Sequence, residues 1–271
     1  MGAADRIDLH VHTDFSDGEF TPRRTAELAL EAGLRAMAVT DHDTMEGLAD
    51  LTPPQGLEIV PGVERKAWWH DRELHVLGYW CDWAYLKAHS KAEAQRAARN
   101  AAIIEKLRAD GVDISPEELY AMKKGVVGRP HIGELLMRKG YFPSVRAAFD
   151  EWLAEGKPYY VPLIRPTVAE TAAELRAAGA KVVLAHPYQY RFPPEELAEL
   201  VRFCADRGFH GVEVYYSGYT PEASRALIRL AAGAGLCVTG GSDFHGARRP
   251  ERKLGAPEVP YALLEILKEK P

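Results

Sequence analysis

The stretch DLHVHTDFSDG, residues 8–18, decides how the rest of the chain is interpreted. It begins as a strand, and alternate side chains of a strand share a face, so His10 and His12 point the same way. Two imidazoles on one face can hold a metal ion, and Asp17 follows a turn from which its carboxylate can fold back toward that ion. The pair alone fits two ordinary polar residues equally well, so the interpretation depends on what recurs later.

Length and composition describe a globular protein. The 271 residues allow one large α/β domain or a domain with an insert, and 46% are hydrophobic and 27% charged. No run of about 18 apolar residues and no basic leader occurs, so we expect a cytoplasmic protein without a membrane span. Cys81, Cys204 and Cys237 are isolated, which suggests a reducing compartment. The net charge of −5 argues against general binding of duplex DNA.

Short runs rich in Val, Ile and Leu alternate with helical stretches, which is typical of β-α units around a mostly parallel sheet. We predict strands at residues 6–12, 36–41, 58–64, 74–79, 159–163, 181–186, 211–216 and 237–243. Thr21-Pro22 and Thr220-Pro221 each read as a helix cap followed by the first helical residue, with Gly33 and Gly233 as stops.

The strand rhythm disappears between Leu86 and Gly156. An Ala-, Lys- and Arg-rich run covers residues 87–110, a capping box starts at Ser115, and Arg129-Pro130-His131 opens a further helix. We therefore predict an α/β barrel interrupted by a small helical insert. The predicted parts are residues 1–85 (first part of the barrel), 86–157 (insert) and 158–271 (second part).

Nearly every predicted strand ends in a residue type that binds metals. In a β/α barrel the carboxyl ends of the strands face one rim, so these side chains would converge. His75 fits less neatly, because it precedes its apolar run, so its strand would run the opposite way or begin at the rim. The predicted ligands are His10, His12, Asp17, His42, Glu64, His75, His186, Asp243 and His245.

Each of these residues taken singly is more often a surface or core polar residue, and Asp41 or Asp243 could simply cap a helix or form a turn. A coincidence at almost every strand end is harder to accept than a metal cluster. Imidazole and carboxylate without thiolate suit Zn, Mn or Fe. Nine candidates exceed the needs of one ion, so two or three divalent ions are expected, with Glu64 and Asp243 as natural bridges.

These segments resemble the PHP (polymerase and histidinol phosphatase) family, in order and over nearly the whole chain. The resemblance implies a distorted (β/α)₇ barrel with a trinuclear metal centre that hydrolyses phosphoesters. The motifs that carry it are Asp8-Leu9-His10-Val11-His12, Ser16-Asp17-Gly18, Thr40-Asp41-His42-Asp43, Pro61-Gly62-Val63-Glu64, His75-Val76-Leu77-Gly78, Ala185-His186-Pro187 and Ser242-Asp243-Phe244-His245.

The insert resembles one branch of that family, through Gly128-Arg129-Pro130-His131 and residues 155–162. That branch contains nucleoside 3′,5′-bisphosphate phosphatases, also described as 5′→3′ exoribonucleases of the ribonuclease AM type. The resemblance implies removal of a 3′-phosphate from a nucleoside bisphosphate, or release of 5′-nucleotides from short 5′-phosphorylated RNA.

The residues of the insert agree with phosphate binding, although a surface salt bridge is the plainer interpretation of Arg129 alone. Arg129 begins a predicted helix, where a guanidinium and free amide groups form an anion site. We expect it to hold the 5′-phosphate of the substrate. The further predicted phosphate ligands are His131, Lys157, Tyr159 and Arg191.

The expected chemistry is attack of a metal-bridging hydroxide on phosphorus, with Asp17, His42 or His186 able to protonate the leaving oxygen. The expected ligand sets are His10, His12, Glu64 and Asp243 for one ion; Glu64, His75 and His186 for a second; and Asp17, His42, Asp243 and His245 for a third.

Three alternatives stay open on sequence alone: a small-metabolite phosphatase such as histidinol phosphatase, a proofreading module, and an inert metal-binding module. The oligomeric state is also open.

Overall fold

The computed structural model describes residues 5–89, 91–122, 126–163 and 165–271. The chain divides into two compact units: Met1–Ala88 with Pro166–Pro271, which we call the barrel unit, and His89–Arg165, the insert unit. From the sequence we predicted an insert at residues 86–157. The insert unit of the structure begins at His89 and ends at Arg165.

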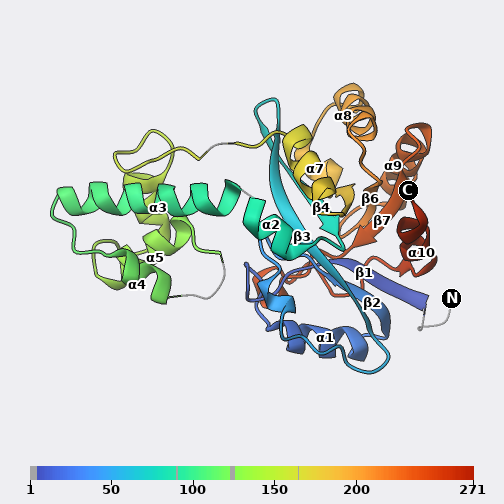
Figure 1. The fold of residues 1–271 in the computed structure, drawn as a ribbon, viewed down its shortest axis with the longest axis horizontal. Coiled ribbons are helices and arrows are strands. Elements are labelled where there is room, and N and C mark those ends of the chain that lie inside the picture. The colour runs from blue at the N-terminus through green and yellow to red at the C-terminus, as the bar shows by residue number, and fades with distance from the viewer. Residues whose placement is uncertain (1–4, 90, 123–125, 164) are drawn as a thin grey trace. The chain divides into compact units, whose positions relative to one another are not determined.

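The barrel unit is built on one eight-stranded sheet with the order β7-β6-β5-β4-β3-β2-β1-β8 (Figure 1). β1 and β7 approach so closely that a Cβ at Gly241 would collide with His10, and the His12 amide donates to the Phe244 carbonyl over 3.0 Å. The sheet is therefore a nearly closed barrel, which confirms the predicted fold class. Its strands are β1 (Arg6–Val11), β2 (Leu34–Val39), β3 (Glu58–Trp69), β4 (Arg72–Tyr79), β5 (Lys181–Leu184), β6 (Gly211–Tyr216), β7 (Cys237–Gly241) and β8 (Val259–Pro260).

β4 runs antiparallel to both of its neighbours, β3 and β5. Its first residues therefore lie toward the rim where β1, β2, β5, β6 and β7 end, and this reversal brings His75 there. β3 is longer than the predicted strand, which ended at Glu64, because its second half pairs with β4 as far as the Trp69–Arg72 pair.

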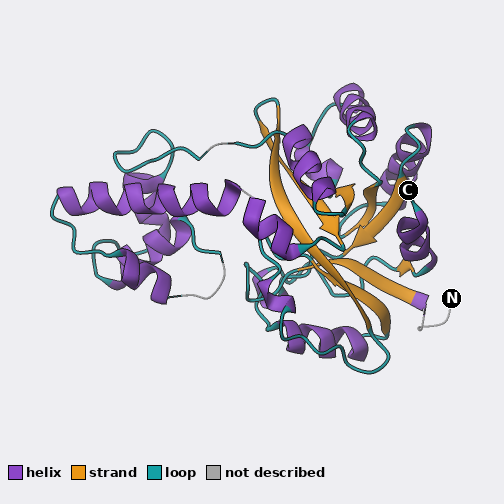
Figure 2. Ribbon diagram, viewed as in Figure 1, coloured by secondary structure: helices purple, strands orange, loops and turns teal. Residues whose placement is uncertain are grey.

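Helices surround the strands of the barrel unit (Figure 2). The two Thr-Pro signals are confirmed: the Thr21 hydroxyl accepts the Arg24 amide, and the Thr220 hydroxyl accepts the Ala223 amide. The helices around the barrel are α1 (Pro22–Glu31), α2 (Trp83–His89), α7 (Val168–Ala177), α8 (Pro194–Asp206), α9 (Pro221–Gly233) and α10 (Ala262–Glu269). The short turns are η2 (Glu46–Leu48), η4 (Pro187–Tyr190) and η5 (Gly246–Arg248).

The interior of the barrel is apolar away from the rim. Ile7, Leu9, Leu77 and Tyr79 are fully buried there, and the Tyr79 hydroxyl donates to the Leu9 carbonyl over 2.8 Å. Burying each such side chain stabilises the fold by about 1.5–3 kcal/mol. This packing fixes the strands whose ends carry the polar residues described below.

The insert unit is helical and has its own core. Its elements are α3 (Lys91–Ala109), α4 (Pro116–Ala121), α5 (Arg129–Arg138), α6 (Val145–Ala148) and the π-helical turn η3 (Phe149–Leu153). The predicted capping box at the start of α4 is present, between Ser115 and Glu118. Residue 90, inside the predicted run 87–110, lies outside the described residues.

The predicted strand at residues 159–163 is wrong. These residues form turns and irregular structure. Pro162 has no amide to donate to a ladder, and the Tyr159 ring is buried in the core of the insert with Ile103, Leu107 and Ile132.

No described helix is both long and apolar enough to cross a bilayer.

Candidate metal centre

The rim of the barrel holds one continuous cluster of imidazoles and carboxylates. All nine predicted ligands belong to it, and within each group the ligand atoms lie within 4.8 Å of one another. The groups are His12, Asp17, His42 and His245; His10, His12 and Asp243; His10, Glu64 and His186; and His42, Glu64 and His75. Each group shares a residue with another, so the cluster is a single site.

Glu64 is the centre of this cluster. Its Oε1 lies 2.8 Å from His75 Nδ1 and 3.1 Å from His186 Nε2, and its Oε2 lies 3.1 Å from His42 Nδ1. Glu64 belongs to two of the groups, as a bridging ligand would. Asp243 belongs to only one, whereas the sequence expected it to serve two ions.

Asp17 and Asp243 complete the site on the other side. Asp243 Oδ1 lies 3.1 Å from His12 Nε2, and Asp17 Oδ1 lies 3.2 Å from His245 Nε2. The side chain of Asp17 is 47% exposed, compared with 21% for His42 and 7% for His186. Of the three candidate proton donors, Asp17 is therefore the most accessible.

The nitrogens of the cluster fit ligation of cations. His10 Nε2, His12 Nε2, His42 Nδ1 and His75 Nδ1 are buried, and within the described part of the chain none has a hydrogen-bond partner of good geometry. Yet each lies 2.8–3.3 Å from a carboxylate oxygen. A buried polar atom left unsatisfied costs about 1–3 kcal/mol. A cation shared by nitrogen and oxygen would satisfy all four.

Mutual charge perturbs the titration of these groups. Burial alone would raise the pKa of Glu64, but the charges of His75, His10 and His42 hold that pKa well below its usual value. Against the opposing effect of burial, the adjacent carboxylates of Asp243 and Glu64 raise the pKa of His12 to about 10. Burial lowers the pKa of His42 to about 4. The carboxylates are thus ionised at neutral pH, as metal ligands must be.

Glu213 is a residue of the site that the sequence reasoning missed. It is fully buried on β6, its Oε1 lies 3.1 Å from His10 Nδ1, and its Oε2 accepts the His186 amide over 2.8 Å. A carboxylate that holds the far nitrogen of an imidazole fixes the tautomer and orientation of a metal ligand. The lone acid within the apolar run Gly-Val-Glu-Val-Tyr-Tyr was the available signal.

Asp243 has supporting partners as well. Its Oδ2 accepts the Tyr216 hydroxyl over 2.7 Å and forms an ion pair with Arg252, whereas Oδ1 faces the imidazoles. The carboxylate is therefore held so that one oxygen points to the cluster.

Asp8 and Asp41 organise the backbone around the site. Asp8 accepts the Ser242 and Gly255 amides over 2.9 and 2.8 Å. Asp41 accepts the Thr13 amide over 2.8 Å and also the Ser16 hydroxyl, so it acts as a turn former, which was one of the two options weighed for it.

The predicted phosphate ligands divide between the units. Arg129 and His131 lie on α5 of the insert unit, where His131 Nδ1 accepts the Gly128 amide over 3.1 Å. Lys157 is an exposed residue of the same unit, and Arg191 is exposed at the end of η4 in the barrel unit. The Tyr159 hydroxyl donates to Asp110 over 2.8 Å, so the contacts of Tyr159 are structural ones within the insert.

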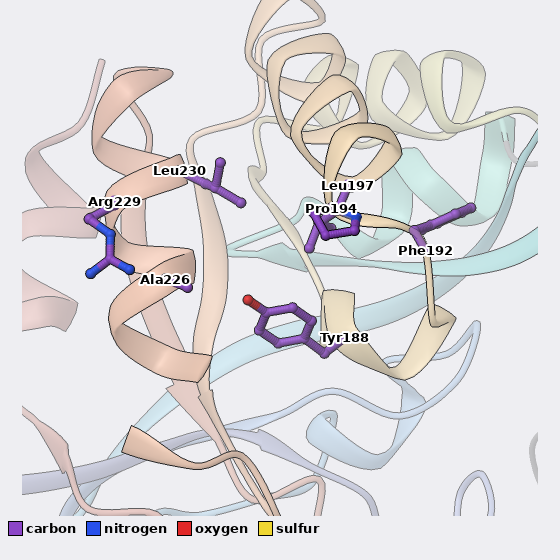
Figure 3. Close-up of a pocket in the computed structure, with 7 residues that line it drawn as sticks. All are labelled: Tyr188, Phe192, Pro194, Leu197, Ala226, Arg229 and Leu230. Atoms are coloured by element: carbon purple, nitrogen blue, oxygen red, sulfur yellow. The ribbon is translucent and has the colours of Figure 1, made fainter. Parts of the chain in front are cut away.

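A separate cavity of about 350 Å³ lies beside η4, between α8 and α9 (Figure 3). Its lining is largely apolar and contains no acid or imidazole, so it is not part of the cluster. The lining residues are Tyr188, Phe192, Pro194, Leu197, Ala226, Arg229 and Leu230.

Comparisons with known proteins agree with this geometry. The model of the PHP domain family matches residues 8–163. The 5′-3′ exoribonuclease Rnm of Escherichia coli is 31% identical over 249 residues, covering 88% of this chain and 84% of the relative. The 3′,5′-nucleoside bisphosphate phosphatase of Chromobacterium violaceum is 27% identical, covering 93% of this chain and 91% of the relative.

Among solved structures, one from Bifidobacterium adolescentis described as a metal-dependent phosphoesterase superposes with a TM-score of 0.75. It is 32% identical and covers 98% of this chain and 96% of its own.

Proposed function

The chain belongs to the PHP domain family of phosphoesterases, and from that premise we propose a substrate and a reaction for it. The enzyme removes the 3′-phosphate of nucleoside 3′,5′-bisphosphates and releases 5′-nucleotides from short 5′-phosphorylated RNA. The observation that carries the proposal is the nine-residue cluster of the barrel rim, whose atoms match the donors that Mn, Zn or Fe prefer.

Two to three divalent ions bound there would neutralise charge on the phosphoryl oxygens and activate the attacking water. The chain itself supplies the positioning. Glu213 orients His10, and Tyr216 with Arg252 fixes Asp243. Of the three residues that the sequence offered as proton donors, Asp17 and His42 are the more exposed, and both belong to the cluster.

Arg129 would bind the 5′-phosphate of the substrate. Its Nη1 donates to the Leu153 carbonyl over 2.9 Å and its guanidinium lies 5.0 Å from the Tyr160 ring, which leaves other donors available. No described acidic residue pairs with it. The E. coli and C. violaceum relatives, by their names, act on RNA and on nucleoside bisphosphates.

Arg99 strengthens the case for an anion beside Arg129. Its Nη2 lies 3.5 Å from the place where a Cβ of Gly128 would be, at the start of α5. Burial, and then the charges of Arg129 and Arg96, lower the pKa of Arg99 to about 10. The proximity of Arg99 and Arg129 concentrates positive charge at the start of α5, which favours the binding of a phosphate there.

The test is phosphate release from adenosine 3′,5′-bisphosphate in the presence of manganese, before and after chelation. We expect turnover that chelation abolishes and manganese restores. Turnover of histidinol phosphate with none of the bisphosphate would instead favour the small-metabolite alternative, and purified folded protein that binds no metal would favour the inert module.

Replacing Arg129 tests the recognition of the 5′-phosphate. Arg129→Ala should lower kcat/KM for the bisphosphate about 100-fold or more, since a charge-assisted phosphate contact is lost, while turnover of a simple aryl phosphate changes little. Arg138→Ala, at the other end of α5, is the matched control. An equal loss on both substrates would contradict the assignment.

A further inference from the structure

A basic loop follows the last metal motif of the chain. We define it as residues 246–253, in which four cations accompany a single acid, Glu251. The whole chain has a net charge of −5, so this concentration of positive charge is local. The cations of the basic loop are Arg248, Arg249, Arg252 and Lys253.

Two of these cations attach the basic loop to the metal cluster. Arg248 Nη1 donates to the backbone carbonyl of Asp17 over 3.0 Å. Arg252 pairs with Asp243 Oδ2 and lies 5.6 Å from the Tyr216 ring. Asp17 and Asp243 belong to different ligand groups, so the loop is fixed to the cluster at two points.

The other two cations are free for a ligand. Arg249 and Lys253 are exposed, and the side chain of neither makes a hydrogen bond or ion pair with any residue that the structure describes. The two acids that contact the basic loop or belong to it have other partners. Glu19 accepts the Ala247 amide, and Glu251 Oε1 lies 3.9 Å from Arg252 Nε. Two unpaired cations are therefore held beside the site of phosphoester cleavage.

We propose that Arg249 and Lys253 bind backbone phosphates of an RNA chain on the 3′ side of the linkage being cleaved. The inference rests on the proposed function, because an enzyme that releases 5′-nucleotides one at a time must hold the strand that remains. Exposed Arg and Lys side chains suit contacts to backbone phosphates, and such contacts carry no sequence preference. A nucleoside bisphosphate has no phosphates at that position, so the basic loop distinguishes RNA from the mononucleotide.

The test compares two substrates in one double variant, Arg249→Ala with Lys253→Ala. For 5′-phosphorylated oligouridylate we expect kcat/KM to fall about tenfold, because two exposed charge contacts are lost and each such contact is weak. The slope of log(kcat/KM) against log salt should become shallower by about 1.4, the amount that two phosphate contacts on a single strand provide. Turnover of adenosine 3′,5′-bisphosphate should be unchanged.

Two further variants separate charge from structure. The charge-preserving pair Arg249→Lys with Lys253→Arg should retain RNA turnover. The charge-matched control Arg202→Ala with Arg229→Ala removes two exposed cations from α8 and α9 and should leave both substrates unaffected.

The inference is overturned if the double variant loses no more RNA turnover than this control, or if it loses turnover equally on both substrates. A wild-type enzyme that cleaves the bisphosphate but not the oligouridylate also overturns it, and the bisphosphate proposal would then still stand. Failure on both substrates overturns the proposed function as well.

Discussion

Glu64 lies at the centre of the cluster. Five imidazoles lie within 3.3 Å of its two oxygens, and its side chain is only 1% exposed. A buried carboxylate in that position is stable only while positive charge surrounds it. The ions that we propose would supply that charge permanently, whereas imidazoles supply it only when protonated.

That these nine side chains come together was predictable, because most of them lie in short motifs near the end of a predicted strand. Their supporting residues were not: Glu213 stands within an apolar strand, and Arg252 reaches Asp243 from a loop nine residues further along the chain. Such contacts depend on how the strands close into the barrel, and no local sequence pattern predicts that closure.

Replacing Glu213 tests its positioning of His10. Glu213→Gln keeps an acceptor for the His186 amide but removes the charge beside His10 Nδ1. We expect the affinity for Mn²⁺, measured by calorimetry, to fall about 10–100-fold, which is typical for loss of such a partner. Glu222→Gln, on the surface of α9, serves as the control. An unchanged affinity in a folded Glu213→Gln protein would contradict the role.

At the scale of elements, the reversed strand β4 is the feature that completes the site. Its direction places His75 beside Glu64, and the sequence left open whether that strand reversed or merely began at the rim. The helix starts were predictable, because a Thr cap followed by Pro is a local signal. The sequence could not show that residues 159–163 do not form a strand. The aromatic and β-branched residues there are common in strands, and they suit the core of the insert equally well.

His210 joins two neighbouring strands at the other end of their hydrogen-bonded run. Its Nδ1 accepts the Val182 amide over 2.9 Å, at the beginning of β5, and its own amide donates to the Val182 carbonyl over 2.7 Å. Burial, followed by the charges of Lys181, Arg176 and Lys270, lowers the pKa of His210 to about 4. The neutral ring is therefore the form that the fold favours.

This shift predicts a loss of stability in acid. Between about pH 6.5 and 4 the unfolded chain binds a proton at residue 210 that the folded chain does not, so stability falls as the pH is lowered through that range. His210→Asn retains an acceptor for the Val182 amide but cannot titrate. Its urea midpoint should fall less between pH 7 and pH 5 than that of the wild type. Equal falls would contradict the assignment.

At the scale of the whole molecule, side chains from β1, β3, β4 and the loops after β1, β2, β5 and β7 meet in one cluster. Closing the barrel therefore assembles the site, and occupying the site should in turn stabilise the closed barrel. Ions that bind only the folded state stabilise it by mass action.

Metal-dependent stability follows from this coupling. Free Mn²⁺ at 100 times its dissociation constant should add about 2.7 kcal/mol to the free energy of unfolding for each independent site. Thermal unfolding of metal-free and manganese-loaded protein measures the effect. A control titration with Mg²⁺, which prefers oxygen ligands to imidazole, should give a smaller rise. No rise with manganese would count against an ion-binding barrel.

The most direct measurement of the central claim is anomalous X-ray diffraction from crystals of manganese-loaded protein, recorded at the manganese absorption edge. We predict two or three peaks, each within coordination distance of some of the nine side chains of the cluster, which are Glu64, Asp17, Asp243 and the six imidazoles. A loaded crystal with no peak among these side chains, or with its peaks elsewhere on the molecule, would contradict it.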